Sequence, residues 1–284
     1  MVSGDSIDMK GFPLEGVTVI PVEEVPVPAG PCFTGPGLVV NPGEFRLHVA
    51  EVGEFYAASG TLVKYSLAGG ADPEWVRLYL NGQVLVALLH QRDIISFHAS
   101  SFVSGGKGVM ILGETGAGKS SLTLSFVKVG AGFLTDDLTP VVFPGGKPSV
   151  MPLNRRMKIR TSTAAELGVD PERLTDAESG TGKKYIEITP AGSAGHQVDV
   201  ILKIEVGDIA EPLFEEPAAA GKFSLLRSEV CSWEILAGMP ETEAAYLQQI
   251  LDIVHQAKVF RVTRPSDIRI ADFYESVKAF LGSF

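Results

Sequence analysis

The residues with the clearest chemical potential form one glycine-rich loop. Positions 113–120 read Gly-Glu-Thr-Gly-Ala-Gly-Lys-Ser and match the Walker A pattern G-x-x-x-x-G-K-S. Glycines let such a loop curl so that successive amide hydrogens point at one phosphate, and the helix that follows offers its N-terminal amides to the same anion. The spacing therefore predicts a nucleoside triphosphate site. The residues assigned to it are Gly113, Glu114, Thr115, Gly116, Ala117, Gly118, Lys119, Ser120 and Ser121.

The pattern also assigns roles within the loop and selects the nucleotide. Lys119 is predicted to contact the β- and γ-phosphates, and the hydroxyl of Ser120 is predicted to hold Mg²⁺. The glycines run G-x-x-G-x-G, whereas a dinucleotide-binding loop requires G-x-G-x-x-G. The chain contains no Asn-Lys-x-Asp sequence of the kind that reads guanine. ATP with Mg²⁺ is therefore favoured over GTP and over a dinucleotide.

Two adjacent aspartates, Asp136 and Asp137, follow the loop after one predicted helix and one predicted strand. Phosphoryl transfer needs a group that orients and deprotonates the attacking hydroxyl, and a carboxylate for Mg²⁺. At a strand end the pair would return to the loop at the carboxyl edge of the sheet, where ligands gather in α/β folds. The pair is predicted to be catalytic, with Asp136 also a metal ligand; the alternative is that Asp137 only begins a turn.

His98 precedes the loop on a predicted strand. A lone histidine on a strand is more often a core or edge residue than a functional one. Its side-chain pKa lies near neutrality, however, so that it can donate a hydrogen bond to a phosphate oxygen or help to position an acceptor. We include His98 among the candidate catalytic residues.

The elements that must position these residues alternate between strand and helix. Strands are predicted over 94–103, 109–112 and 139–143, with a hairpin turn at 105–108 and an amphipathic helix over 121–129. Further strands are predicted over 198–206 and 259–262, and helices over 241–257 and 267–281. This alternation indicates an α/β domain over 93–284.

Residues 1–92 differ in character and are predicted to form a separate, β-rich lobe with one helix. Prolines 21, 26 and 28 confine the early strands to sheet edges or loops, and residues 45–69 are typical of a β-meander. Apolar residues then recur at helical spacing over 72–91, where Gly82 is expected to interrupt the helix.

The segment 150–195 is less regular and contains two basic clusters, each with two possible interpretations. Arg155, Arg156, Lys158 and Arg160 could neutralise phosphate or acceptor charge, although a solvated strand face is slightly favoured. Lys183 and Lys184 follow a glycine-containing stretch, 179–182, that could close over the nucleotide or form an ordinary surface turn.

Composition excludes several classes of protein. The 284 residues are 45% apolar, which excludes a disordered chain, and the net charge of −10 argues against nucleic-acid or anionic-membrane partners. Cys32 and Cys231 stand too far apart in the sequence to suggest a disulfide framework or a metal cluster. The first ten residues are polar, and no apolar run approaches the ~20 residues of a membrane-spanning helix. The prediction is a cytoplasmic protein.

Residues 98–137 resemble the catalytic core of the HPr kinase/phosphorylase family. The resemblance rests on His98, the loop 113–120, and Val129-Gly130 followed by residues 133–137, which is similar to the family pattern Arg/Lys-Gly-x-x-Leu-x-Asp-Asp. It implies a fold similar to that of phosphoenolpyruvate carboxykinases. It also implies that Asp137 is the base toward a substrate serine, that Asp136 is its partner near the metal and that His98 lies on the phosphate side. The family has glutamate directly after the loop serine, where this chain has Ser121.

The function predicted from these residues is an ATP- and Mg²⁺-dependent kinase. Its acceptor would be a serine-type hydroxyl of a protein, a peptide or a small molecule. Two alternatives remain open: a carboxykinase or small-metabolite kinase on the same scaffold, and a non-catalytic ATP-binding regulatory protein. The acceptor, the direction of transfer and the oligomeric state, a homo-oligomer included, are not determined by the sequence.

Overall fold

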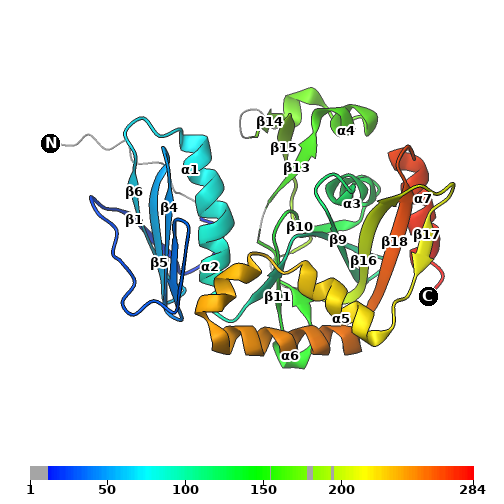
Figure 1. Cartoon of the computed structure of the whole chain (residues 1–284). Helices are drawn as coiled ribbons and strands as arrows, with labels where there is room; N and C mark the ends of the chain where they lie inside the picture. The colour runs from blue at the N-terminus through cyan, green and yellow to red at the C-terminus, as the bar shows by residue number, and fades with distance from the viewer. Residues whose placement is uncertain (1–11, 154, 178–181, 193–194) are drawn as a thin grey trace. The chain divides into compact units, whose positions relative to one another are not determined.

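The structure is a computed structural model that describes residues 12–153, 155–177, 182–192 and 195–284 (Figure 1). The chain forms two compact units. The first contains residues up to Ile95 together with Ser232–Leu247, and the second contains Ser96–Cys231 and Gln248–Phe284. The sequence predicts a boundary between residues 92 and 93, with all later residues in one domain. In the structure, however, the segment Ser232–Leu247 belongs to the first unit.

The first unit is built on a six-stranded sheet with the order β1-β6-β5-β4-β3-β2. Its core strands form the antiparallel meander that the sequence predicts over 45–69, and β1 lies at an edge, where the lack of an amide hydrogen at Pro21 is tolerated. Phe45, Phe55 and Val63 point into the core. The strands are β1 (Thr18–Pro21), β2 (Phe33–Gly35), β3 (Leu38–Asn41), β4 (Glu44–Val49), β5 (Gly53–Ala58) and β6 (Leu62–Leu67).

The helix predicted over 72–91 is present in three pieces, which are α1 (Pro73–Tyr79), a π-helical turn η1 (Leu80–Val84) and α2 (Leu85–His90). Asp72 caps it by accepting a hydrogen bond of 2.8 Å from the amide of Glu74. The break lies at Gly82, whose φ of −104° and ψ of −106° are not helical, so the interruption expected there is confirmed. A 3-10 helix, η4 (Trp233–Gly238), completes this unit, and α6 (Pro240–Gln256) runs from the first unit into the second.

The second unit is built on a mixed sheet of nine strands, ordered β10-β8-β9-β16-β12-β11-β7, with β18 beside β16 and β17 beside β18. β16 pairs in parallel with β9 on one side and with β18 on the other, which makes a parallel centre with antiparallel flanks. The strands are β7 (Ile95–Phe97), β8 (Ala99–Ser104), β9 (Lys107–Gly113), β10 (Gly132–Thr135), β11 (Thr139–Val142), β12 (Ser149–Val150), β16 (His196–Gly207), β17 (Leu213–Glu215) and β18 (Lys258–Pro265).

The hairpin predicted between 94 and 112 is present with one correction. Gly105 and Gly106 form the turn between β8 and β9, and both have a positive φ, as a two-residue hairpin requires. The single strand predicted over 94–103 is wrong, because it breaks at His98 into β7 and β8. The His98 amide donates to the carbonyl of Glu229 at 3.0 Å, and Phe97 forms an isolated bridge with Val230, so the backbone pairs outside the hairpin at this point.

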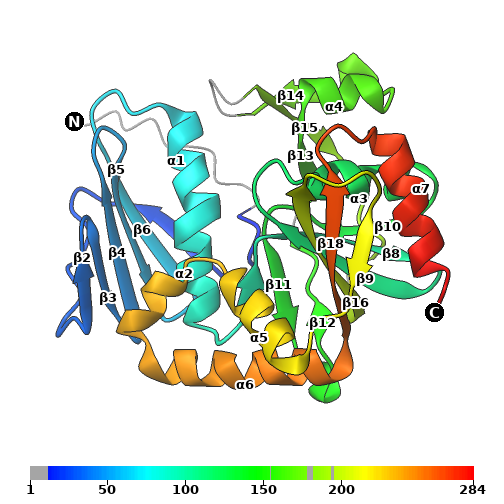
Figure 2. The ribbon, with the colours of Figure 1, turned by 45° about the vertical axis from the view of Figure 1, so that its right-hand side comes forward.

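Helices α3 (Lys119–Lys128) and α7 (Ile270–Leu281) pack on one face of this sheet, and α7 runs beside β18 (Figure 2). Phe126 of α3 stacks on Phe102 of β8 with ring centroids 4.5 Å apart. Burial of this apolar face is what holds the start of α3 against the end of β9. A further helix, α5 (Ala219–Ser228), precedes the return to the first unit, and two short 3-10 turns occur at η2 (Pro144–Gly146) and η3 (Pro171–Arg173).

Three short strands form a small antiparallel sheet in the segment 150–195, where the sequence predicts only a short helix over 164–167. Its order is β13-β15-β14, with β13 (Arg156–Arg160), β14 (Leu174–Asp176) and β15 (Lys183–Glu187), and α4 (Thr161–Glu166) follows β13. Met157, Ile159 and Ile186 from one face pack against Leu124 of α3 and Phe133 of β10. Residues 179–181 of the predicted mobile stretch lie outside the described residues. No helix among the described residues has the length and apolarity needed to cross a membrane.

Candidate functional site

The loop between β9 and α3 has the conformation that the glycine spacing predicts. Gly116 and Gly118 have φ values of 91° and 104°, a region that favours glycine, and Gly118 caps α3. A Cβ at Gly113 would lie 2.6 Å from the carbonyl oxygen of Ile204 on β16. Glycine is therefore required where the loop leaves the strand.

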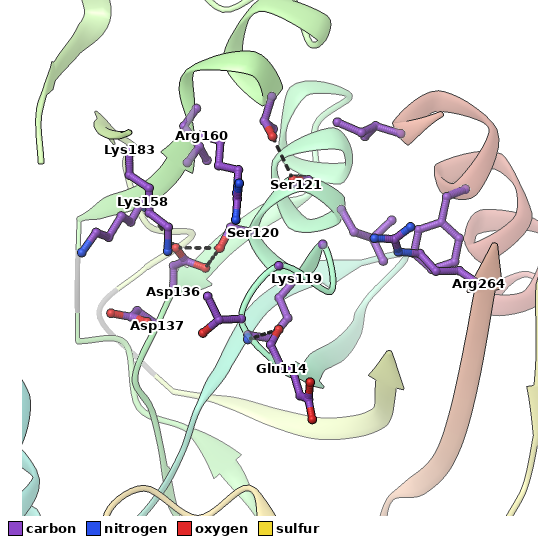
Figure 3. Close-up of a pocket in the computed structure, with 18 of the residues that line it drawn as sticks. Glu114, Lys119, Ser120, Ser121, Asp136, Asp137, Lys158, Arg160, Lys183 and Arg264 are labelled. Carbon is purple, nitrogen blue, oxygen red and sulfur yellow. Dashed lines mark hydrogen bonds between the residues drawn. The ribbon is translucent and has the colours of Figure 1, made fainter. Parts of the chain in front are cut away.

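A cavity of about 270 Å³ opens over this loop, and Figure 3 shows the side chains around it. Seven of the nine loop residues assigned from the sequence line it. Gly113 and Ala117 do not: the first ends the strand, and Ala117 packs in the core under α3. The cavity is also lined by His98, Asp136 and Asp137, so the structure brings every candidate catalytic residue to one place.

Lys119 is buried with 7% of its surface exposed, and its ammonium group folds back onto the loop. Nζ donates to the carbonyls of Gly113 at 2.5 Å and Glu114 at 3.2 Å. Burial lowers the pKa of Lys119, while the nearby charges of Asp137 and Glu229 act in the opposite direction. A phosphate that entered the cavity would have to replace these two carbonyls as the partner of the ammonium group.

Asp136 lies at the bottom of the cavity with 2% of its surface exposed. Its carboxylate accepts hydrogen bonds from the hydroxyl of Ser120 at 2.8 Å and from the amide of Lys158 at 3.1 Å. Burial, reinforced by the charge of Asp137, raises the pKa of Asp136 to about 6, although the hydrogen bonds that it accepts oppose this. We call Lys119, Ser120 and Asp136 the cavity floor.

The cavity floor fits Mg²⁺ as the sequence predicts it. Among the described residues no group of three or more His, Cys, Asp or Glu side chains is placed to hold a metal ion. Mg²⁺ seldom needs such a group, because it takes one or two protein oxygens and completes its shell with phosphate oxygens and waters. The hydroxyl of Ser120 and the carboxylate of Asp136 are in contact and supply that minimal set.

Asp137 differs sharply from its neighbour, because its side chain is 63% exposed at the cavity. Its φ is 72°, and the amide of Leu138 donates to the carbonyl of Asp136 at 2.9 Å across it. This is a γ-turn with a positive central φ, the rarer and more strained of the two forms. Thr135 and Thr139 fasten the turn, since their hydroxyls donate to Leu138 and Ala99. Strain of this kind persists where the surroundings impose it and clusters at functional sites.

His98 lies beside this turn, at the break between β7 and β8. Its Nδ1 is 3.1 Å from the carbonyl oxygen of Asp137 and 3.6 Å from a carboxylate oxygen of the same residue. A carbonyl only accepts, so Nδ1 carries the proton in this contact. Burial and the positive charge of Lys119 lower the pKa of His98, which keeps the ring neutral near pH 7 with a lone pair on Nε2.

An ion pair lies close enough to Lys119 and His98 for its charges to act on them. Lys203 on β16 pairs with Glu229, which follows α5, and both side chains are largely buried. The charge of Glu229 reaches both Lys119 and His98 and raises the pKa of each against the effect of burial. Cys231, in the same region, has a pKa raised to about 12 by burial, so its thiol stays protonated and is not a nucleophile.

Two groups of lining residues come from parts of the chain that the sequence did not assign to the site. One is basic: Lys158, Arg160 and Lys183, from the small sheet. The sequence had marked both basic clusters, but it could not show that alternate residues of β13 face the loop. The other group comes from the end of β18 and the residues after it, and consists of Arg264, Ser266, Ile268, Ile270 and Phe273. No sequence signal pointed to it.

Arg264 is already engaged by backbone. Its Nε donates to the carbonyl of Ala117 at 2.8 Å, and Nη1 donates to the carbonyl of Pro265 at 2.8 Å. Because Ala117 lies within the loop, Arg264 fastens the loop to the end of β18. The apolar side chains of Ile268, Ile270 and Phe273 lie next to it in the lining and offer a surface for a nucleobase.

Comparisons with known proteins add little to this geometry. No family model matches the sequence, and no curated protein matches it either. The fold is similar to a structure described as the HPr(Ser) kinase/phosphatase from Coxiella burnetii, with 14% sequence identity and a TM-score of 0.35. The match covers 66% of this chain and 95% of that one. A likeness this distant carries no argument about activity, so the functional argument rests on the cavity itself.

Proposed function

We propose that the chain is an ATP- and Mg²⁺-dependent phosphotransferase that moves the γ-phosphate to a serine-type hydroxyl of a protein, a peptide or a small molecule. The observation that carries this proposal is the division of labour between Asp136 and Asp137. The first is buried and bonded to Ser120 next to the phosphate loop, and the second is exposed on a strained turn at the same cavity. A site that only bound nucleotide would have no need for the second carboxylate.

The transfer follows from this placement. The acceptor oxygen forms a bond to the γ-phosphorus as the bond to the β–γ bridging oxygen breaks, and the electron pair of that bond leaves with ADP. The hydroxyl proton passes to the carboxylate of Asp137, which is exposed and can approach the acceptor. The neutral ring of His98 donates from Nδ1 to the backbone of Asp137 and so holds the turn in place.

The loop and the cavity floor neutralise the negative charge of the phosphates. Loop amides and Lys119 bind the phosphates, with Nζ exchanging its two carbonyl partners for phosphate oxygens. Ser120 and Asp136 would hold Mg²⁺, which when bound neutralises charge on the β- and γ-phosphates. Arg264 keeps the loop fixed to β18 through Ala117.

The test is transfer from γ-labelled ATP by the purified chain with Mg²⁺, using pools of proteins, serine peptides and hydroxyl-bearing metabolites as acceptors. Label on a hydroxyl group of any acceptor supports the proposal. Tight ATP binding without label in any pool would instead favour a non-catalytic nucleotide-binding protein. Nucleotide-dependent decarboxylation of a keto acid would favour the carboxykinase alternative.

A further inference from the structure

In the small sheet β13-β15-β14, strand β13 carries its charged side chains on one face. Alternate residues of β13 share a face, and the register places Arg156 opposite Glu187, Lys158 opposite Tyr185 and Arg160 opposite Lys183. Met157 and Ile159, which alternate with them, are buried in the core on the other face. The charged face is therefore the one that borders the cavity.

The pairs along this sheet differ in charge. Arg156 faces a glutamate, and Lys184 faces Asp176, with which it forms an ion pair. Arg160 and Lys183, by contrast, are two cations directly opposite each other. Like charges in that arrangement destabilise a sheet. Among the described residues no carboxylate lies within ion-pair distance of either side chain, so the repulsion is not relieved within the part of the chain that the structure describes.

The position of this pair relates it to the phosphate loop. Both side chains line the cavity, and a Cβ at Gly116 would lie 3.9 Å from a terminal nitrogen of Arg160. In Figure 3 the guanidinium group of Arg160 extends toward Ser120, on the side of the loop opposite Arg264. Arg264 is held by two carbonyls, whereas the guanidinium group of Arg160 reaches the loop without a carboxylate partner among the residues that the structure describes.

We propose that Arg160 and Lys183, which we call the cationic pair, clamp the terminal phosphate of a nucleoside triphosphate and make the site selective for triphosphate over diphosphate. The inference rests on the nucleotide site of the proposed function. Two opposed cations beside the loop are stable when an anion lies between them, and a terminal phosphate brings two negative charges in a geometry that a guanidinium fork matches. During transfer the charge on the equatorial oxygens of that phosphate persists, so Arg160 also stabilises the transition state.

The experiment compares the affinities of MgATP and MgADP for the full chain by calorimetry. We expect Arg160→Gln and Lys183→Gln to weaken MgATP binding about tenfold and MgADP binding less than twofold. Lys184→Gln is the matched control, since it removes a neighbouring charge on the opposite face, paired with Asp176. Arg160→Lys keeps the charge without the fork and should recover part of the lost affinity.

If the variants weakened the binding of MgATP and MgADP equally, the clamp would be overturned, because the pair would then act on the whole loop and not on the terminal phosphate. Unchanged affinities for both, with a raised KM for the acceptor, would also overturn it and assign the pair to the acceptor. The proposed function can fail separately. If the chain binds MgATP and the variants lose selectivity for ATP, but no phosphate is transferred, the clamp is supported and the kinase proposal is overturned. A wild-type chain that binds neither nucleotide overturns both proposals.

Discussion

The cavity floor and the cationic pair border the same cavity but are in opposite electrostatic conditions. The cavity floor is internally satisfied: Lys119 is bonded to loop carbonyls and Asp136 to Ser120 and a backbone amide. The cationic pair, by contrast, consists of Arg160 and Lys183 on opposed positions of two neighbouring strands, with no carboxylate partner within the described part of the chain. A phosphate that binds at the floor must displace existing hydrogen bonds, whereas one that binds at the pair only adds new contacts.

This difference separates two ways in which the site can use a phosphate. Where an incoming group replaces an existing partner, the contact that is lost offsets part of the gain in affinity, and the new arrangement is the one in which the chemistry occurs. Where it relieves a repulsion, nearly all of the interaction contributes to binding. We therefore expect changes around the floor to affect transfer, stability and the affinity for both nucleotides. We expect changes in the pair to affect the affinity for the triphosphate and so the selectivity between the two.

The largest expected effect is at Asp137, which adjoins the floor but is exposed. Asp137→Asn should lower the rate of transfer by roughly 10³-fold, because the amide cannot accept the hydroxyl proton, and should leave MgATP affinity within about twofold. Single-turnover transfer of labelled phosphate measures the first, and calorimetry measures the second. Asp252→Asn on α6, which is not among the cavity-lining residues, is the control. Transfer that survives within tenfold would show that another group takes the proton.

A second, smaller effect tests whether the floor exchanges its partners. Lys119→Ala should weaken both MgATP and MgADP binding, each roughly 10–100-fold, since Lys119 contacts the loop at its base and not only beside the terminal phosphate. This contrasts with the cationic pair, for which only MgATP should weaken. Lys128→Ala, at the far end of the same helix, should leave both affinities unchanged. Selective loss of MgATP binding in Lys119→Ala would remove the distinction between floor and pair.

The third effect is one of stability and depends on pH. Burial raises the pKa of Asp136 from its ordinary value of 3.8 to about 6, so the ionised carboxylate destabilises the nucleotide-free fold above that pH. Asp136→Asn removes this cost, and we expect the free energy of unfolding to rise by about 2–3 kcal/mol at pH 8. The gain should shrink as the pH falls from about 6, and it should vanish well below 3.8, where Asp136 is protonated in both the folded and the unfolded state.

Urea unfolding at several pH values measures this gain. The same measurement with added MgATP compares how much the ligand stabilises the variant and the wild type. Because Asn cannot balance the charge of Mg²⁺, the variant should gain little stability from added MgATP, while the wild type gains more. A gain that stayed constant from pH 4 to pH 8 would show that the amide improves hydrogen bonding and that the burial of charge is not the cause.

The floor could be predicted from the sequence and the cationic pair could not, for a physical reason. A phosphate loop is local: the glycines, Lys119 and Ser120 fix its shape within eight residues, and one helix and one strand return Asp136 to it. The basic face of β13 depends on register with β15, more than 20 positions later, and strands this short and partly polar carry little pattern. The break at His98 was missed for the same reason, since it depends on the carbonyl of Glu229.

The smallest expected effect distinguishes the two regions most directly. Lys183→Gln removes one of two opposed cations, so the nucleotide-free protein should become more stable by about 0.2–1 kcal/mol. The gain from Asp136→Asn depends on pH, whereas this one should depend on salt. It should shrink between 0.05 M and 0.5 M salt as exposed charges are screened. Lys184→Gln, which breaks an ion pair, should change stability in the opposite direction or not at all. A Lys183→Gln variant that is less stable at low salt would mean that an anionic side chain of the protein already lies between the two cations.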